Sequence, residues 1–398
     1  MRLDVRSITD DCINSVFSRY NEMFTKLAGD DLGKSIVDNW KGSALREEST
    51  LHQIGPYIGK MKSSMAMTLV STFTLEGETV YDPFCGSGTV AFEAWATGRN
   101  VIANDLSPYA VVLTRAKLFP WVSEEETIAE INIVDRQVRN LAPRVDLRTI
   151  PKWVRAFFHP ETLRETVAWF QVLRSRRSYF LLSCLLGILH HQRPGFLSYP
   201  SSHTVPYLRQ KKFPRDMYPE LYQYRPVQER LKKKVIRALK RIPPLDFRLI
   251  RNCHMRNAAK FVPEQRVNVI ITSPPYMRQL DYGRDNRLRL WFLGIPDWKS
   301  LDQTISPSES EFLRVFKSCL KLWHDVLTSG GLCILVLGDT YSRLYDMALP
   351  DAIAKIAIKE IKGYSMSWSY TESIPNIRRV RRGYSGSQTE TILVLRKN

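Results

Sequence analysis

The sequence predicts an α/β fold built on a doubly wound, mostly parallel sheet. Three observations indicate it: a strand, glycine loop, helix and strand follow one another over residues 78–103, strand–helix alternation returns after residue 267, and two strand-like segments end the chain. With 398 residues, 44% of them hydrophobic, the chain can bury the core that such a sheet needs.

The first part of the sheet is expected from apolar periodicity and turn residues. The strand at 78–81 leads directly into a glycine-rich loop, and the second strand ends at Asn104-Asp105. The expected elements are a helix at 52–73, a strand at 78–81, a loop at 82–89, a helix at 90–97, a strand at 100–103 and a helix from Pro108.

Residues 123–246 interrupt this order and are expected to form a largely helical insertion. Its predicted helices are 161–174, 179–190 and 227–241, with a Pro- and Tyr-rich loop at 193–226. The sheet then resumes with a strand at 268–272, a helix at 309–327, a strand at 332–337, a helix at 348–362 and an antiparallel hairpin at 365–370 and 391–397. The expected domains are an N-terminal helical segment (1–50), a sheet domain (51–122 and 247–398) and the insertion (123–246).

The charge of the chain indicates a polyanionic partner. Lys and Arg number 58 against 40 Asp and Glu, which gives a net charge of +18, and such a surplus favours nucleic acid first. The six cysteines stand singly without metal-ligand spacing, so buried reduced thiols and no metal site are expected. No signal-peptide pattern opens the chain, and the longest apolar run, 179–189, is too short for a membrane span. A cytoplasmic protein without membrane contact is expected.

The loop after the first strand predicts a cofactor site. It reads Asp82-Pro83-Phe84-Cys85-Gly86-Ser87-Gly88-Thr89, and ligands of open α/β sheets bind at the carboxyl ends of the strands. The loop lacks the Gly-Lys-Ser/Thr of a triphosphate site. The Asp82 carboxylate can hold the ammonium of an amino-acid group, and Asp105 can accept hydrogen bonds from ribose hydroxyls.

A second signature, Thr272-Ser273-Pro274-Pro275-Tyr276, follows the strand at 268–272. Two prolines fix the backbone and remove two amide donors, which leaves carbonyl acceptors free. Acceptors at Ser273 Oγ and the Pro274 carbonyl suit the hydrogens of an exocyclic amino group on a base. Tyr276 could stack on a base that has left its helix.

Together these strings resemble the S-adenosylmethionine-dependent amino-methyltransferases that act on DNA bases, and the likeness covers about 50–120 and 246–398. The resemblance implies a Rossmann-like class I methyltransferase sheet, S-adenosylmethionine as cofactor, and catalytic roles for Ser273, Pro274, Pro275 and Tyr276. In this family Ser at the first motif position is associated with the 4-amino group of cytosine. Asp at that position goes with the 6-amino group of adenine.

The resemblance also implies a set of cofactor-binding residues. The segment from His52 to Lys60 and the turn Asn104-Asp-Leu-Ser-Pro-Tyr109 look like further family motifs. Where the family often has an acidic residue for the adenine ring, this chain has Arg251-Asn252-Cys253-His254. The expected cofactor contacts are Tyr57, Lys60, Asp82, Pro83, Phe84, Cys85, Gly86, Ser87, Gly88, Thr89, Asp105, Leu106, Asn252 and Cys253. Tyr282 is expected either as a wall of the base pocket or as core, and Asp339 as a substrate contact or a plain turn.

The nucleic acid is expected on the insertion and on the terminal hairpin loop. Residues 206–256 hold 15 Lys and Arg against 4 Asp and Glu, so most of the surplus lies there, and interleaved cations and aromatics suit phosphate contacts with stacking. The insertion is therefore the candidate target-recognition region. The expected contacts are Arg209, Lys211, Lys212, Arg215, Lys232, Lys233, Lys234, Arg378, Arg379, Arg381 and Arg382.

The main hypothesis is a site-specific methyltransferase that modifies cytosine in double-stranded DNA within a restriction–modification system, with a cognate restriction nuclease as a further partner. Adenine in DNA and a base in RNA remain alternative targets, and a nucleic-acid binder without activity is a third hypothesis. Methylation at carbon 5 of cytosine is disfavoured, because none of the cysteines follows a proline. The oligomeric state stays open.

Overall fold

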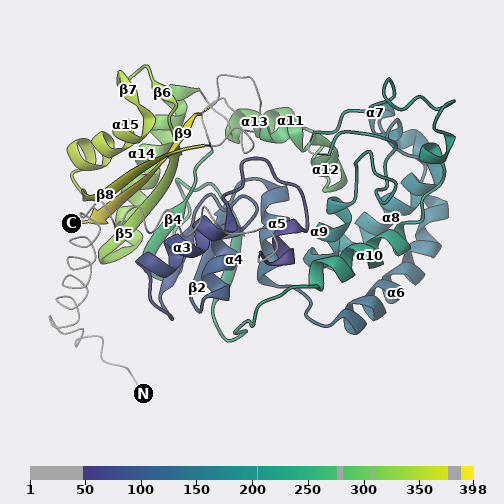
Figure 1. Ribbon diagram of the computed structural model, residues 1–398, viewed down its shortest axis with the longest axis horizontal. Coiled ribbons are helices and arrows are strands. Elements are labelled where there is room, and N and C mark those ends of the chain that lie inside the picture. Colours follow the sequence, from purple (N-terminus) through teal and green to yellow (C-terminus); the bar gives the residue numbers. More distant parts are fainter. Residues whose placement is uncertain (1–47, 204, 276–280, 306–307, 375–386) are drawn as a thin grey trace.

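Seven strands form one twisted sheet, which lies to the left of the helical insertion in Figure 1. The computed structural model describes residues 48–203, 205–275, 281–305, 308–374 and 387–398. The strand order is β3-β2-β1-β4-β5-β9-β8; the first five strands are parallel and β9 runs antiparallel to both of its neighbours. The strands are β1 (Thr79–Asp82), β2 (Asn100–Asp105), β3 (Arg251–Met255), β4 (Val267–Thr272), β5 (Leu327–Gly338), β8 (Tyr364–Ser373) and β9 (Thr389–Lys397). This confirms the Rossmann-like sheet with an antiparallel terminal hairpin.

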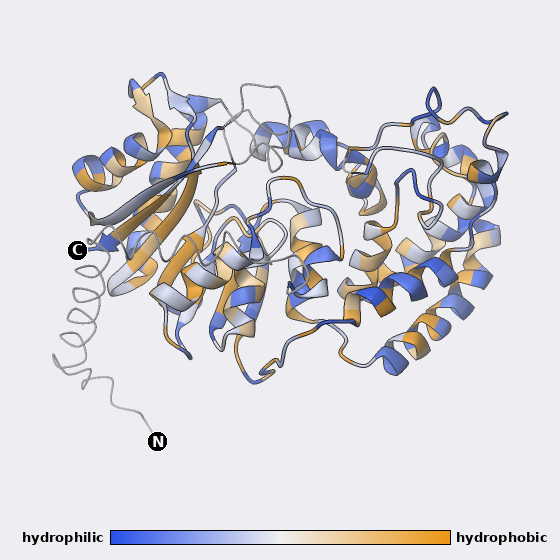
Figure 2. Cartoon of the chain, viewed as in Figure 1, coloured by the Kyte–Doolittle hydropathy of each residue, from blue (hydrophilic) through white to orange (hydrophobic). Residues whose placement is uncertain are grey.

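Alternating side chains of the strands enter two separate hydrophobic clusters, one on each face of the sheet. Val80 belongs to one cluster and Tyr81 to the other, and the same alternation separates Val269 from Ile270. Figure 2 shows the central strands as largely hydrophobic, while the surrounding helices alternate between hydrophobic and hydrophilic residues. The first face is covered by α3 (Ser63–Phe73), α4 (Thr89–Ala96) and α5 (Pro108–Leu118), and the second by α14 (Glu309–Val326) and α15 (Leu349–Lys355).

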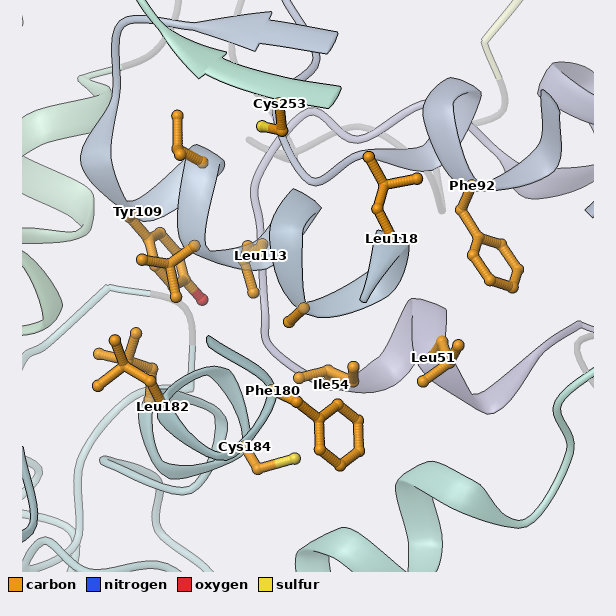
Figure 3. Close-up of a cluster of buried hydrophobic side chains, with 14 of the residues drawn as sticks. Leu51, Ile54, Phe92, Tyr109, Leu113, Leu118, Phe180, Leu182, Cys184 and Cys253 are labelled. Atoms are coloured by element: carbon orange, nitrogen blue, oxygen red, sulfur yellow. The ribbon is translucent and has the colours of Figure 1, made fainter. Parts of the chain in front are cut away.

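The insertion lies beside the sheet and shares its first hydrophobic cluster (Figure 1). Figure 3 shows the junction, where Phe180 lies next to Ile54 and Leu182 lies on the side of Tyr109. The insertion and the sheet thus bury apolar surface against each other rather than in two separate cores. Its helices are α6 (Glu124–Leu141), α7 (Lys152–Arg155), α8 (Pro160–Ser175), α9 (Tyr179–Gly187) and α10 (Val227–Leu239), with 3₁₀ turns η2 (Ala142–Arg144), η3 (Leu147–Thr149) and η4 (Pro219–Tyr222).

Three short helices follow β4 and lead to α14. They are α11 (Tyr282–Asp285), α12 (Arg287–Phe292) and α13 (Trp298–Ile305). A small antiparallel pair, β6 (Tyr341–Ser342) and β7 (Met347–Ala348), connects β5 to α15, which continues as a π-helical turn, η5 (Ile356–Ile361).

The single helix expected over 52–73 is wrong. A 3₁₀ turn, η1 (Thr50–Gln53), comes first, and α3 begins only at Ser63. The residues between them include Pro56, which cannot donate within a helix, and Gly59, whose φ of 74° is incompatible with a right-handed helix. Strand β3, helix α6 and helices α11–α13 were not expected from the sequence, and the segment expected at 1–50 lies almost wholly outside the described residues.

Five of the six cysteines lie in the described part of the chain, where all five are free and buried. Within the same ranges, none of the helices combines the length and the apolar character needed to span a membrane.

Candidate active site

A cavity of ≈ 540 Å³ opens at the carboxyl ends of β1, β2 and β4. Its wall combines the glycine-rich loop, the end of β2, the segment before α3 and the residues that follow β4. The volume lies in the range of pockets that bind cofactors and drug-sized ligands. The first strands of a doubly wound sheet place a ligand site at this edge.

Asp82 lines the cavity and is 3% exposed. The Thr272 hydroxyl donates to Asp82 Oδ1 at 2.7 Å, and the Phe84 amide donates to the same oxygen at 3.3 Å. Burial and, to a lesser extent, the nearby negative charge of Asp105 raise the pKa of Asp82 to about 7, although the two hydrogen bonds act in the opposite direction. The carboxylate therefore faces a space in which a cationic ligand group would stabilise its charged form.

Asp105 ends β2 on the same cavity wall. Its carboxylate accepts from the Gly86 amide and from the Ser107 amide, both at 2.8 Å. Burial raises the pKa of Asp105 to about 6, while these backbone donors stabilise its charged form. Gly86 has a φ of 49°, which favours glycine, so the loop can turn and aim its amide at Asp105.

The segment before α3 brings Tyr57 and Lys60 to the cavity. The Tyr57 ring lies 6.0 Å from the Tyr109 ring and 6.3 Å from the Tyr282 ring, measured between centroids. A Cβ on Gly86 would come within 3.2 Å of the Tyr57 ring, which is a second reason for glycine at that position. Lys60 Nζ donates to the His52 carbonyl at 3.2 Å.

The Ser-Pro-Pro segment meets the glycine-rich loop because β4 is the neighbour of β1. Ser273 and Pro275 line the cavity, whereas the side chain of Pro274 is buried and does not form part of the cavity wall. The Thr272 bond to Asp82 ties the two motifs together at 2.7 Å. Tyr276 lies outside the described residues.

Most of the predicted cofactor residues come together at the cavity wall. Gly88 does not line it; with a φ of 71°, it packs so closely on α5 that a Cβ would come within 2.6 Å of Thr114 Oγ1. Asn252 and Cys253 do not line it either, so the structure does not support the adenine contacts expected there. The predicted residues that line the cavity are Tyr57, Lys60, Asp82, Pro83, Phe84, Cys85, Gly86, Ser87, Thr89, Asp105 and Leu106.

The cavity wall beside β3 is formed by Arg256, Asn257 and Ala258, which follow the predicted pair in the chain. Asn104 at the end of β2 holds this turn in place. Its amide donates to the Arg256 carbonyl at 3.0 Å, and its carbonyl accepts from the Arg256 amide at 3.1 Å. The Asn104-Asp105 pair indicated this part of the cavity in the sequence. Only the pairing of β2 with β3 shows that Asn104 contacts Arg256.

Further cavity residues come from helices that the sequence did not predict or left without a role. Tyr282, expected as pocket wall or core, lines the cavity from α11, and Gln303 and Thr304 line it from α13. Phe84 stacks on Phe316 of α14 with 6.5 Å between ring centroids. Of this segment, only Tyr282 was expected at the cavity, and nothing in the sequence indicated Gln303 or Thr304.

Asp339 behaves as a plain strand-end turn. Its carboxylate accepts from the Gln388 amide at 3.0 Å and from the amide and hydroxyl of Thr389 at 3.0 and 3.1 Å. These bonds hold the start of β9 against the end of β5, and they account for the residue without a substrate.

The predicted nucleic-acid residues of the insertion do not share one environment. Lys233 is exposed and Lys232 half-buried, but Lys234 points inward, where its Nζ donates to the Gln53 carbonyl at 2.7 Å. Burial lowers the pKa of Lys234 to about 8, so the expected phosphate contact at Lys234 is corrected to an internal hydrogen bond. Four cations of the loop before α10 are exposed: Arg209, Lys211, Lys212 and Arg215. Outside the described residues lie Arg378, Arg379, Arg381 and Arg382.

A family model described as DNA methylase, N6_N4_Mtase, matches residues 16–115 and 267–398, which make up more than half of the chain. The chain belongs to the DNA methylase family. The matched ranges contain the glycine-rich loop, Asp105 and the Ser-Pro-Pro motif, and they leave out the insertion. S-adenosylmethionine is the methyl donor of this family.

Individual relatives are distant. The Type II methyltransferase M.BsoBI of Geobacillus stearothermophilus is 22% identical over 280 residues, or 64% of this chain and 54% of that protein. The chain thus spans about half the length of this curated relative. TrmN from Thermus thermophilus has a TM-score of 0.34 at 13% identity, covering 85% of this chain and 50% of that one. The rRNA methyltransferase aviRa of Streptomyces viridochromogenes has a TM-score of 0.33 at 10% identity, covering 86% and 87%.

Proposed function

We propose that the protein transfers a methyl group from S-adenosylmethionine to the 4-amino group of cytosine in double-stranded DNA. The observation that carries the proposal is the joining of the two motifs at one cavity: Thr272 donates to Asp82 at 2.7 Å, and Ser273 lines the cavity beside the glycine-rich loop. A cofactor bound on the loop and an amine held at Ser273 would therefore be neighbours, and this proximity is what a direct transfer requires.

The residues of the cavity fit the cofactor. Its amino-acid end carries an ammonium and a carboxylate, and the cavity offers the buried Asp82 carboxylate for the first and Lys60 for the second. Asp105 is placed to accept from the ribose hydroxyls, and the turn at Asn257 and Ala258 replaces Asn252 and Cys253 as the proposed surroundings of the adenine ring. When bound, S-adenosylmethionine supplies a methyl group on a positively charged sulfur.

The chain's own residues orient the amine. The lone pair of an exocyclic amine is delocalised into the base, so the group is a weak nucleophile. We assign to Ser273 Oγ and the Pro274 carbonyl the role of accepting its hydrogens, and to Tyr276 that of stacking on the flipped base. Tyr282, opposite Tyr57 at 6.3 Å, is an aromatic wall on the side of the cavity formed by α11.

The proposed DNA surface includes one face of α10. Arg230, Lys233 and Arg237 are spaced three and four residues apart, so they share one face, and they line a groove of ≈ 580 Å³ with Glu229 as its one acidic side chain. Cations about one helical turn apart suit successive phosphates of a nucleic-acid strand. Together with the exposed cations of the loop at 209–215, this face makes the insertion the proposed target-recognition region, next to a catalytic domain formed by 51–122 and 247–398.

The target base and the biological setting go beyond the family. Ser273 at the first motif position favours cytosine over adenine, and the likeness to a Type II methyltransferase supports a restriction–modification role with a cognate nuclease. We also propose that the protein acts in the cytoplasm.

A tritium-transfer assay tests the reaction and its substrate. Purified protein with methyl-tritiated cofactor should label duplex DNA and leave total RNA unlabelled. Ser273→Ala should reduce transfer at least about 100-fold, as expected for a group that orients the reacting atom, with the affinity for S-adenosylhomocysteine unchanged within about twofold. Labelling of RNA alone would mean that RNA, and not DNA, is the substrate. Equal losses of transfer and of cofactor affinity would contradict the role assigned to Ser273.

A further inference from the structure

Three buried titratable side chains form a chain of hydrogen bonds beneath the segment that carries Tyr57 and Lys60. His52 Nε2 lies 2.6 Å from Glu93 Oε1, and His52 Nδ1 lies 3.2 Å from Lys117 Nζ. The exposed fractions are 2% for His52, 2% for Lys117 and 8% for Glu93. They come from η1, α4 and α5, and none of them lines the cavity.

The donors and acceptors of this chain define one protonation pattern when Lys117 is an ammonium and Glu93 is a carboxylate. An ammonium can only donate, so Lys117 donates to Nδ1, and the ring proton then lies on Nε2 and is donated to the Glu93 carboxylate. Burial and the positive charges of Lys117 and Lys60 lower the pKa of His52, in keeping with a neutral ring. The ring is thereby fixed in orientation by a helix on each side.

This network is not expected to stabilise the fold more than apolar side chains in the same place. Burial raises the pKa of Glu93 to about 8 and lowers that of Lys117 to about 7, which shows that both charged forms are unfavourable where they lie. Glu48, Lys60 and the Cys85 thiol are the other titratable groups that act on the pair. Apolar side chains of the same volume are commonly as stable as a buried ion pair or more so.

The network reaches the cavity through the backbone of His52. Lys60 Nζ donates to the His52 carbonyl at 3.2 Å, and Lys60 lines the cavity. The His52 ring packs edge-on against Phe92 at 5.0 Å, next to Glu93 on the helix that begins where the glycine-rich loop ends. His52 therefore joins Lys60 to the helix that supports the loop.

Other bonds hold η1 in place without the network. Thr50 Oγ1 donates to the Ala238 carbonyl of α10 at 2.8 Å, and Lys234 Nζ donates to the Gln53 carbonyl at 2.7 Å. Leu51 and Ile54 are buried in the core between α4, α5 and α9 (Figure 3). Loss of the network should therefore move the His52 carbonyl locally and leave the fold intact.

We propose that His52, Glu93 and Lys117 are positioning residues that hold the Lys60 ammonium where it meets the carboxylate at the amino-acid end of the cofactor. The inference rests on the proposed function, because it takes S-adenosylmethionine as the occupant of the cavity. None of the three residues touches the cofactor, and their contribution passes through Lys60.

A double-mutant cycle tests this role with S-adenosylhomocysteine as the probe, by calorimetry on the full chain. Lys60→Met and Glu93→Gln should each raise Kd about tenfold, the size expected for one charge-assisted hydrogen bond. The double variant should bind no more weakly than either single variant, because both remove the same interaction. For Glu93→Gln, kcat at saturating cofactor should stay within about twofold, while KM for the cofactor rises.

Thr97→Val is the matched control. Thr97 Oγ1 donates to the Glu93 carbonyl at 2.7 Å on the same helix, so its loss should lower Tm and leave Kd unchanged. If Glu93→Gln does not fold, Glu93→Gln with Lys117→Met removes both charges together and takes its place in the cycle. If the double variant raises Kd by the product of the two single effects, the positioning role is overturned while the proposed function is not. A wild-type protein that did not bind S-adenosylhomocysteine would overturn the proposed function as well.

Discussion

Asp82 is the residue on which the account of the cofactor site depends most. It is a buried carboxylate in the wall of a cavity, and its burial is unfavourable for the charged form. Such an arrangement is stabilised by a ligand that brings a positive charge. The hydrogen bonds from Thr272 and Phe84 orient the carboxylate without neutralising it.

The raised pKa of Asp82 gives a prediction with a definite sign. Because only the carboxylate attracts an ammonium, the affinity for S-adenosylhomocysteine should fall as the pH drops through about 7, by up to about tenfold per unit. Stability without cofactor should change in the opposite direction: a folded-state pKa raised above 3.8 makes the folded state lose stability as the pH rises from about 4 to 7. Calorimetric Kd values between about pH 5.5 and 8.5 check the first statement.

Asp82→Asn is the control for this pH profile. This variant should bind S-adenosylhomocysteine weakly at every pH, without the change of affinity near pH 7. Above that pH its Tm should be at least that of the wild type. A wild-type affinity that does not vary across the same step would contradict the assignment of the ammonium to Asp82.

Among the elements, β1, β2, β4 and β5 could be predicted, because each is an apolar run that is followed by polar, glycine or proline residues typical of a turn or a site. Strand β3 could not, since its sequence Arg-Asn-Cys-His-Met lacks an apolar pattern and it pairs only with β2 at the edge of the sheet. That omission explains why the cavity wall was predicted at Asn252 and Cys253 instead of Arg256 to Ala258. The start of helix α6 could have been predicted from the sequence. Ser123 is an N-cap that accepts a hydrogen bond from the Glu126 amide, and three glutamates follow it in the first turn.

Helices α11–α13 show where prediction from the sequence fails. Their role comes from a long-range contact: the Asp302 carboxylate of α13 accepts from the Gly283 and Arg284 amides at 2.7 and 3.0 Å. These bonds cap the start of α11, which carries Tyr282 into the cavity wall. A Cβ on Gly283 would lie 2.4 Å from the Trp298 carbonyl, so the close approach of the two helices requires glycine there.

Loss of the cap should affect both stability and catalysis. Asp302→Ala removes two hydrogen bonds and should lower the free energy of unfolding by about 1–2 kcal/mol, and Tyr282 should lose its fixed position, so that kcat for DNA methylation falls. Asp302→Asn, which keeps an acceptor oxygen, should lose less in both. Denaturant unfolding and single-turnover transfer measure the two effects, and an unchanged unfolding free energy in Asp302→Ala would contradict the cap.

At the scale of the whole molecule, the insertion and the sheet share one hydrophobic cluster, and η1 lies at their junction (Figure 3). The insertion is therefore fixed relative to the cavity, as its proposed role in target recognition requires. Its excess of positive charge could be predicted from the sequence. Which cations face outward could not, because Lys232, Lys233 and Lys234 point to different sides of α10.

The groove on α10 predicts how DNA affinity responds to charge. Lys233→Gln with Arg237→Gln should weaken duplex binding at low salt and reduce the slope of log K against log salt by about 2, one for each phosphate that is no longer neutralised. The affinity for S-adenosylhomocysteine should not change. Arg148→Gln is the control, because Arg148 is an exposed cation of the insertion paired with Asp146. Fluorescence anisotropy over a salt series measures the slopes, and equal slopes in all three proteins would exclude the groove.

The proposed reaction is methylation of the cytosine 4-amino group in DNA. The most direct test is to express the protein in a bacterial host free of DNA methylation and to sequence the genome with modification-sensitive single-molecule reads, beside Ser273→Ala as the inactive control. We expect 4-methylcytosine within one short motif when the wild type is expressed, and none when the variant is expressed. Methylated adenine would keep the family and overturn the base assignment. Unmodified DNA, from protein shown to be folded and to bind S-adenosylhomocysteine, would contradict the claim.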